Sequence, residues 1–234
     1  MNFYDAHSHL HFPENSEALK EFARAKNVWA CSASASLKDM PCLAETASKL
    51  GEFIKAAYGI HPWFASEYKI FPEAELAKFL PYARAVGEIG LDKNRPGYDL
   101  QIEFFRRQLE IASDCGLPAV VHCCGAWGDL VKIRKSVRPA RRFMIHAANC
   151  SAELAGELSK LGAFFSFGAR ELASAKGAAC AKAAEPSKIL VESDGGAKAG
   201  DLLLAAAILA RVRGEGEGRI LEAVGENFSE FFKK

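Results

Sequence analysis

The chain has 234 residues, half of them hydrophobic and a quarter charged, which is enough to bury one large core or two small ones. Its formal net charge of +1 excludes a global basic field of the kind that attracts nucleic acid or acidic membranes, but not a local basic patch. The seven cysteines are scattered and form no Cys-x-x-Cys pair, which argues against a disulfide framework and a structural tetrathiolate zinc site.

The N-terminal segment lacks a basic stretch followed by an apolar one, and no window approaches the roughly 18 apolar residues of a membrane span. We therefore expect a soluble, cytoplasmic protein with reduced cysteines and no membrane association. No low-complexity linker divides the chain, so we expect a single domain over residues 1–234. We infer no obligate protein partner, and the sequence leaves the oligomeric state open.

Short apolar runs recur along the chain, and each is followed by a stretch with the spacing of a helix. We expect eight strands, over residues 2–7, 28–34, 54–60, 85–89, 119–122, 142–146, 163–167 and 189–192. Most of these runs are continuously apolar, as in parallel strands covered on both faces. The alternation predicts an α/β fold, the (β/α)8 TIM barrel, whose working residues sit at the carboxyl ends of the strands. The alternative, a doubly wound open sheet, ordinarily carries a glycine-rich phosphate loop, and this chain has none.

Capping residues mark several of the helices between these strands. A helical pattern begins at residue 98 and continues past residue 111, ending before a glycine and a proline. Ser16, Ser36 and Ser151 each precede a helical stretch and are expected as its N-cap. Residues 214–218 are rich in glycine and predict a turn between two terminal helices.

The histidines are concentrated at the ends of the predicted strands. All six lie at or just after such an end, and none falls in a predicted helix: His7, His9, His11, His61, His122 and His146. The carboxyl ends of barrel strands meet on one face of the fold. This placement therefore predicts that the histidines contribute to one site.

The first cluster, in the segment DAHSHLH, contains His7 and His9 two residues apart. In an extended strand the two imidazoles point the same way and can bind one cation. Imidazole suits zinc and other first-row metals, and an added carboxylate extends the choice toward manganese and magnesium. Asp5 is in phase with both histidines and is a candidate acceptor that would orient one imidazole.

Further candidate ligands follow strongly apolar runs: Glu88, His122, His146 and Asp194. Each is expensive to desolvate unless it is paired or coordinated. A single residue of this kind is more often a solvated strand end, but their joint occurrence with the His-x-His pair predicts a metal centre.

The ordered motifs DAHSHL, GIHPW, GEIGLD, PAVVH, MIHAANCSAEL, FFSFG, ILVESD and ENFSEFF resemble those of the TatD family of metal-dependent hydrolases, which are amidohydrolase-like barrels. The motifs span nearly the whole chain. The resemblance implies a binuclear site for two divalent cations, which could be zinc, magnesium or manganese. It places one cation on His7, His9 and Asp194, the other on His122 and His146, and Glu88 between the two.

The resemblance also implies deoxyribonuclease activity on DNA ends, so DNA or a small phosphodiester is the expected substrate. Two neighbouring cations would lower the pKa of a shared water and neutralise a phosphoryl oxygen. Asp194 could receive the proton of that water, which makes Asp194 and Glu88 the expected catalytic residues. Two alternatives stay open: hydrolysis of a small amide, lactone or ester at the same site, and a non-catalytic, metal-stabilised binding module.

The residues around the predicted metals are less regular. His61 in GIHPW matches a family position beside the metals and is expected to contact substrate. Trp63 and Phe64 could stack a base, although aromatics under a loop more often pack. Cys124 stands where the family usually has a basic residue, which weakens the expected phosphate grip. Cys124 as a thiolate ligand is disfavoured, because the six expected ligands already fill the site.

Two other features bear on substrate placement. Residues 195–196 are both glycine where the family commonly has a small residue and a proline, so this loop gains backbone freedom. Replacement positive charge is available from Arg170 after the seventh strand, and from Lys93 and Arg95 after the fourth, although each is more typical of a solvated position.

Overall fold

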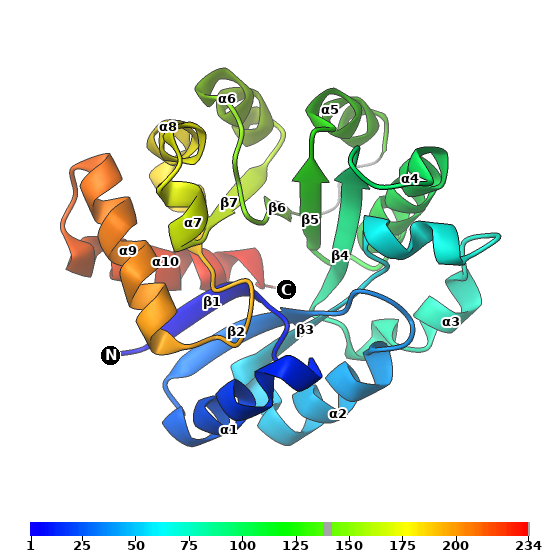
Figure 1. Ribbon diagram of the computed structural model, residues 1–234, viewed down its shortest axis with the longest axis horizontal. Coiled ribbons are helices and arrows are strands. Elements are labelled where there is room, and N and C mark those ends of the chain that lie inside the picture. Colours follow the sequence, from blue (N-terminus) through cyan, green and yellow to red (C-terminus); the bar gives the residue numbers. More distant parts are fainter. Residues whose placement is uncertain (138–141, 234) are drawn as a thin grey trace.

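A computed structural model describes residues 1–137 and 142–233 as a ring of parallel strands surrounded by helices (Figure 1). The eight strands follow one another around the ring in chain order, and each pairs in parallel with the next. They are β1 (Phe3–Ser8), β2 (Val28–Ala33), β3 (Ile54–Tyr58), β4 (Ala85–Asp92), β5 (Ala119–Cys124), β6 (Phe143–Ile145), β7 (Ala163–Phe167) and β8 (Ile189–Val191). The predicted (β/α)8 barrel is confirmed, with strand ends displaced by a few residues.

Most helices lie outside the ring of strands, as Figure 1 shows. The α-helices are α1 (Ser16–Ala25), α2 (Met40–Leu50), α3 (Glu73–Ala77), α4 (Tyr98–Asp114), α5 (Trp127–Ser136), α6 (Ala152–Lys160), α7 (Ala169–Leu172), α8 (Ala175–Ala183), α9 (Ala199–Arg213) and α10 (Glu217–Phe231). Short 3-10 helices are η1 (Pro13–Asn15), η2 (Gly51–Phe53), η3 (Pro62–Glu67), η4 (Leu80–Tyr82) and η5 (Pro186–Lys188). Over the described parts of the chain, every helix is too short or too polar to span a bilayer.

The expected helix starts are partly confirmed. The Ser151 hydroxyl accepts a hydrogen bond from the Leu154 amide and caps α6. The Ser16 prediction is wrong, because α1 already includes Ser16. The Ser36 prediction is also wrong: its amide and its hydroxyl donate to the Asp39 carboxylate at 2.7 and 2.9 Å, and the turn they close delays the start of α2.

The core has two layers. The larger cluster fills the space between strands and helices, and a smaller cluster occupies the barrel interior. Small residues such as Ala57 and Ala85 belong to this inner cluster, which leaves room for side chains from α10 at the amino-terminal end of the strands. Phe228 and Phe231 fill that room, and the Phe231 ring lies 5.2 Å from the Phe164 ring on β7. Helix α10 therefore plugs the end of the barrel opposite the predicted site.

The first and last strands are joined by their following loops. The Asp194 amide donates to the His7 carbonyl at 3.1 Å, and the His9 amide donates to the Gly195 carbonyl at 2.9 Å. These two backbone hydrogen bonds fix the loop after β8 against the loop after β1. They bring residues distant in sequence to one edge of the barrel.

Substituting the α10 plug tests its contribution to stability. Phe231 is fully buried, so Phe231→Ala should lower the free energy of unfolding by about 3–5 kcal/mol through lost contacts and a residual cavity. Urea denaturation followed by circular dichroism measures this change. The control, Tyr82→Ala at a position 72% exposed, should stay within about 0.5 kcal/mol of the parent chain. Equal urea midpoints for the two variants would contradict a stabilising role of Phe231 at the end of the barrel.

Candidate metal centre

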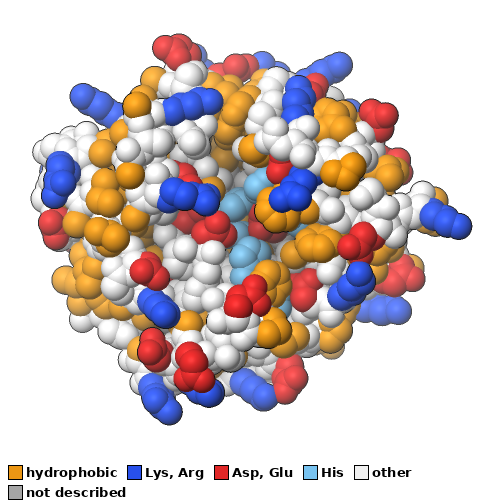
Figure 2. Space-filling model, viewed as in Figure 1, with side chains coloured by type: hydrophobic (Ala, Val, Ile, Leu, Met, Phe, Trp, Pro, Cys, Tyr) orange, Lys and Arg blue, Asp and Glu red, His pale blue; other side chains and the backbone are white. Residues whose placement is uncertain are grey.

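A cleft of about 520 Å³ opens at the carboxyl-terminal ends of the strands. Its lining includes His9, His61, Glu88, His122, His146 and Asp194. Figure 2 shows histidine side chains at the bottom of a central hollow, with acidic and basic side chains around it. The cleft therefore lies where the barrel fold is expected to carry its chemistry.

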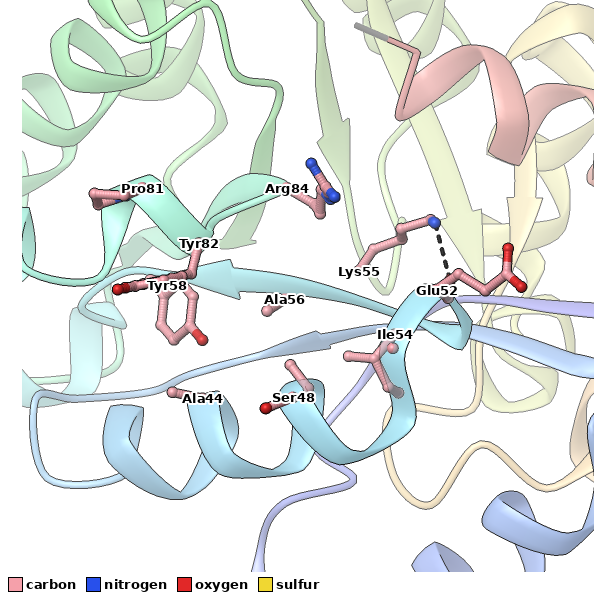
Figure 3. A pocket seen from close by; sticks show the side chains of 12 residues that line it. Ala44, Ser48, Glu52, Ile54, Lys55, Ala56, Tyr58, Pro81, Tyr82 and Arg84 are labelled. Atoms are coloured by element: carbon pink, nitrogen blue, oxygen red, sulfur yellow. Dashed lines mark hydrogen bonds between the residues drawn. The ribbon is translucent and has the colours of Figure 1, made fainter.

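A second hollow, of about 660 Å³, lies outside the barrel between α2, β3 and η4 (Figure 3). Ala44, Ile54 and Ala56 contribute apolar lining, and the Tyr58 ring lies between β3 and α2. Among the described residues that line it, Glu52 is the only carboxylate and there is no histidine or cysteine. This hollow offers no set of metal-binding groups, although it is larger than the cleft.

The Glu88 carboxylate is the centre of the cleft. It belongs to β4, is 2% exposed, and is surrounded by imidazoles from β1, β5 and the loops that follow β1, β3 and β6. Its Oε1 lies 3.0, 3.3 and 2.8 Å from ring nitrogens of His61, His122 and His146. Its Oε2 lies 3.2 and 3.4 Å from Nε2 of His7 and His9. We call Glu88 and these five imidazoles the histidine cage.

The charges of the cage are strongly coupled. Burial opposes ionisation of Glu88, but the imidazoles of His146, His61 and His7 hold its pKa well below the usual value. Burial also opposes the charged form of His146, but the carboxylates of Glu88 and Glu192 raise its pKa well above the usual value. Burial and the neighbouring His146 lower the pKa of His7. An ionised carboxylate thus stands among imidazoles of different basicity.

Asp194 lies at the rim of the cage, in the loop after β8. Its Oδ1 is 3.6 Å from Nε2 of His7 and 3.9 Å from Nε2 of His9, and its side chain is 39% exposed. Its φ of 51° is in the left-handed region, which non-glycine residues uncommonly adopt. The hydrogen bond from the Asp194 amide to the His7 carbonyl holds this conformation.

The donor set fits a divalent metal. Three groups bring their ligand atoms within 4.8 Å of one another: His7 with His9 and Glu88, His7 with His146 and Asp194, and His61 with Glu88 and His122. Within the described chain, the buried Nε2 atoms of His7 and His122 make no hydrogen bond of good geometry, although that of His7 lies 3.2 Å from Glu88. Buried imidazole nitrogens without partners are uncommon, and neutral imidazoles beside carboxylates suit zinc, manganese and related cations. The geometry therefore supports a candidate metal centre.

Six of the seven residues expected at the site line the cleft, and the seventh, His7, is buried beside Glu88. The expectation for Asp5 is wrong. Its Oδ1 accepts hydrogen bonds from the amides of His7 and Ser193, and its Oδ2 accepts one from the Ser193 hydroxyl at 2.6 Å. Asp5 thus holds the backbone of the two joined loops rather than an imidazole. Burial raises the pKa of Asp5 to about 8. The His9 ring is oriented instead by the Ala33 carbonyl, 2.8 Å from its Nδ1.

One histidine lies outside the cage. His11 Nε2 is 2.9 Å from the Asp39 carboxylate and its Nδ1 is 3.2 Å from the Ser32 hydroxyl. These contacts join the loop after β1 to the segment before α2. The expectation that all six histidines contribute to one site therefore holds for the five of the cage and not for His11.

Glu192 is a site residue that the sequence reasoning missed. It is 1% exposed, its Oε1 accepts a hydrogen bond from the Ala147 amide at 2.7 Å, and the same oxygen lies 3.5 Å from Nδ1 of His146. Such a contact orients an imidazole. The available signal was its position in ILVESD, an acidic residue directly after a buried strand and two before Asp194.

The basic and aromatic residues near the cleft contact one another or neighbouring side chains. The Trp63 ring is 45% exposed, and the Arg95 guanidinium lies 3.9 Å from its centre, so Arg95 covers one face on which a base could have stacked. Cys124 Sγ accepts a hydrogen bond from Asn94. Arg170 also lines the cleft and pairs with a neighbouring carboxylate.

Comparisons with known proteins agree with this geometry. The model of the family described as TatD related DNase matches residues 4–233. A metal-dependent hydrolase of Bacillus subtilis is 30% identical over 70% of this chain and 68% of its own. A 3'-5' ssDNA/RNA exonuclease of Erwinia amylovora is 35% identical over 37% of this chain and 35% of its own.

A solved structure gives the same fold over the whole length. A TatD homologue from Escherichia coli superposes with a TM-score of 0.86 at 22% identity, over 99% of this chain and 98% of its own. This likeness concerns the fold, while the family model matches nearly every residue. The chain belongs to the family of TatD-related DNases.

Proposed function

We propose that this protein is a divalent-metal-dependent phosphodiesterase that hydrolyses the ends of DNA, using two cations bound in the cleft. The observation that carries the proposal is the histidine cage, because five imidazoles around one buried carboxylate have no structural purpose that apolar packing would not serve better. The Erwinia relative, named for its action on ssDNA and RNA, supports single-stranded ends as the substrate.

The proposed ligands divide between two cations. His7, His9 and Asp194 would hold one, His122 and His146 the other, and Glu88 would contact both. When bound, two such cations acidify a water and neutralise charge on a phosphoryl oxygen. Zinc, manganese and magnesium are the candidates, with the imidazole-rich set favouring the first-row transition metals.

The chain's own groups supply the remaining chemistry. The Asp194 carboxylate is the most exposed member of the site, so it can accept a proton from an attacking water. His61 accepts a hydrogen bond at Nδ1 from the Trp63 amide at 3.2 Å, which leaves the proton of the neutral ring on Nε2. That nitrogen lies 3.0 Å from Glu88 Oε1, and once Glu88 is engaged by the cations the His61 N–H would be free to donate to a substrate oxygen entering the cleft. We therefore assign His61 to substrate binding.

Replacing either proposed catalytic carboxylate tests the activity. Asp194→Asn and Glu88→Ala should each reduce metal-dependent hydrolysis of a labelled single-stranded oligonucleotide roughly 10³-fold or more, through loss of proton transfer and of metal binding. Release of labelled nucleotide at saturating metal measures the rate. Asp201→Asn, an exposed carboxylate on α9, is the matched control and should keep the parent rate. Unchanged rates in the two site variants would reject the assignment.

Metal binding has a readout that does not depend on activity. A cation present at about 100 times its Kd should stabilise the fold by about 2.7 kcal/mol, and this should appear as a Tm several degrees higher than after chelation. Thermal unfolding with zinc, manganese or magnesium added singly measures the shift, and elemental analysis identifies the resident metal. Glu88→Ala should lose most of the shift. If none of the three metals changes the Tm, the proposed metal centre is rejected.

The two alternative functions give different results in the same assays. Turnover of lactones or small esters with intact phosphodiesters would favour the small-ester hydrolase. Stabilisation by metal without hydrolysis of any substrate would favour a binding module. Hydrolysis of the oligonucleotide that disappears in Asp194→Asn excludes both as the main function.

A further inference from the structure

Arg95 is held in place over Trp63, a residue that lines the cleft. It lies in the loop between β4 and α4, and its guanidinium carbon is 3.9 Å from the centre of the Trp63 ring. The ring is itself anchored, because its Nε1 donates to Asp92 Oδ2 at 2.7 Å. The Arg95 amide donates to the Asp92 carbonyl at 3.2 Å, so the loop that carries Arg95 and the Trp63 ring are both hydrogen-bonded to Asp92. Arg95 thus has a preferred position rather than a freely solvated one.

The charge of Arg95 is not neutralised by this arrangement. Over residues 1–137 and 142–233, Arg95 is the only one of the three candidate replacement cations that makes no ion pair with a carboxylate. The other two are engaged: Lys93 lies 3.1 Å from Asp129, and Arg170 lies 2.8 Å from Glu171. A guanidinium stacked on an aromatic face keeps the N–H donors at its edge available, and these match phosphate oxygens in pairs. Arg95 is therefore poised to bind an anion.

The position of Arg95 relative to the cage sets which anion it can bind. Trp63 Nε1 and His122 Nε2 both approach Asp92 Oδ2, at 2.7 and 3.6 Å, so His122 lies beyond the edge of the indole. The ring centres of Trp63 and His122 are 6.2 Å apart with an interplanar angle of 77°. Arg95 lies over the face of the indole, which displaces it sideways from the cage. Arg95 therefore lies one ring away from His122, where it would meet a second phosphate rather than the one at the cage.

We propose that Arg95, braced by Trp63, binds the phosphate adjacent to the scissile one and makes the enzyme selective for oligonucleotides over isolated phosphodiesters. This inference rests on the proposed phosphodiesterase function. It supplies the cation that is missing at Cys124, whose thiol accepts a hydrogen bond from Asn94 and carries no fixed positive charge. In this proposal the cation that binds phosphate lies in the β4–α4 loop rather than at the end of β5.

Kinetics on two substrates test the proposal. Arg95→Ala should raise KM for a single-stranded oligonucleotide about 10-fold, since a charge-assisted contact is lost, and should leave kcat nearly unchanged. The same variant should hydrolyse bis(4-nitrophenyl) phosphate, which has one phosphate, at the parent rate. Lys93→Ala removes a cation from the same loop and is the matched control, with unchanged kinetics on both substrates. An equal loss on both substrates, or no loss on the oligonucleotide, would overturn the assignment.

A substrate-side change isolates the contact. An oligonucleotide with a neutral methylphosphonate in place of the phosphate next to the scissile one should bind the parent chain about 10-fold more weakly and should abolish the effect of Arg95→Ala. Fluorescence anisotropy at several salt concentrations measures binding. If the parent chain binds these oligonucleotides but cleaves no phosphodiester, the proposed function fails while the Arg95 contact stands. If the losses of binding caused by the methylphosphonate and by Arg95→Ala are fully additive, Arg95 does not contact this phosphate.

Discussion

The interaction on which the site depends is the burial of one ionised carboxylate. Glu88 lies within β4 with almost no access to water, and an isolated carboxylate there would cost several kcal/mol. Imidazoles arranged around both of its oxygens stabilise the charge. No single helix or strand could supply so many donors around one point, whereas strand ends converging in a barrel do so.

A further set of polar contacts holds the residues around Glu88 in position. Asp5 joins the loops after β1 and β8 through the amides of His7 and Ser193, and Glu192 stands behind His146. Both acids are buried, and neither is among the ligands that we propose for the metals. Their contribution is positional: they fix where the loop backbones and one imidazole lie. The proposed metal centre therefore rests on these two buried acids and on backbone hydrogen bonds at its rim.

The sequence predicted the barrel and the convergence of the candidate ligands, because strand periodicity and the rule that parallel strands end together are local and general. It did not predict the role of Asp5, since that role depends on how the loop after β8 folds back onto β1. Helix α2 starts later than expected because the Asp39 carboxylate accepts hydrogen bonds from the amide and the hydroxyl of Ser36 and closes a turn there. The stacking of Arg95 on Trp63 joins two loops, and no periodic pattern encodes such a contact.

The junction of β1 with the loop after β8 has a consequence for how the protein is made. The histidine cage begins at His7, yet the loop that completes its rim contains Asp194 and follows the last strand. Contacts between residues so far apart in sequence form late, after the intervening chain is available. During synthesis His7 and His9 therefore leave the ribosome long before Asp194 exists. The rim of the proposed metal centre is thus completed only after most of the chain has been translated.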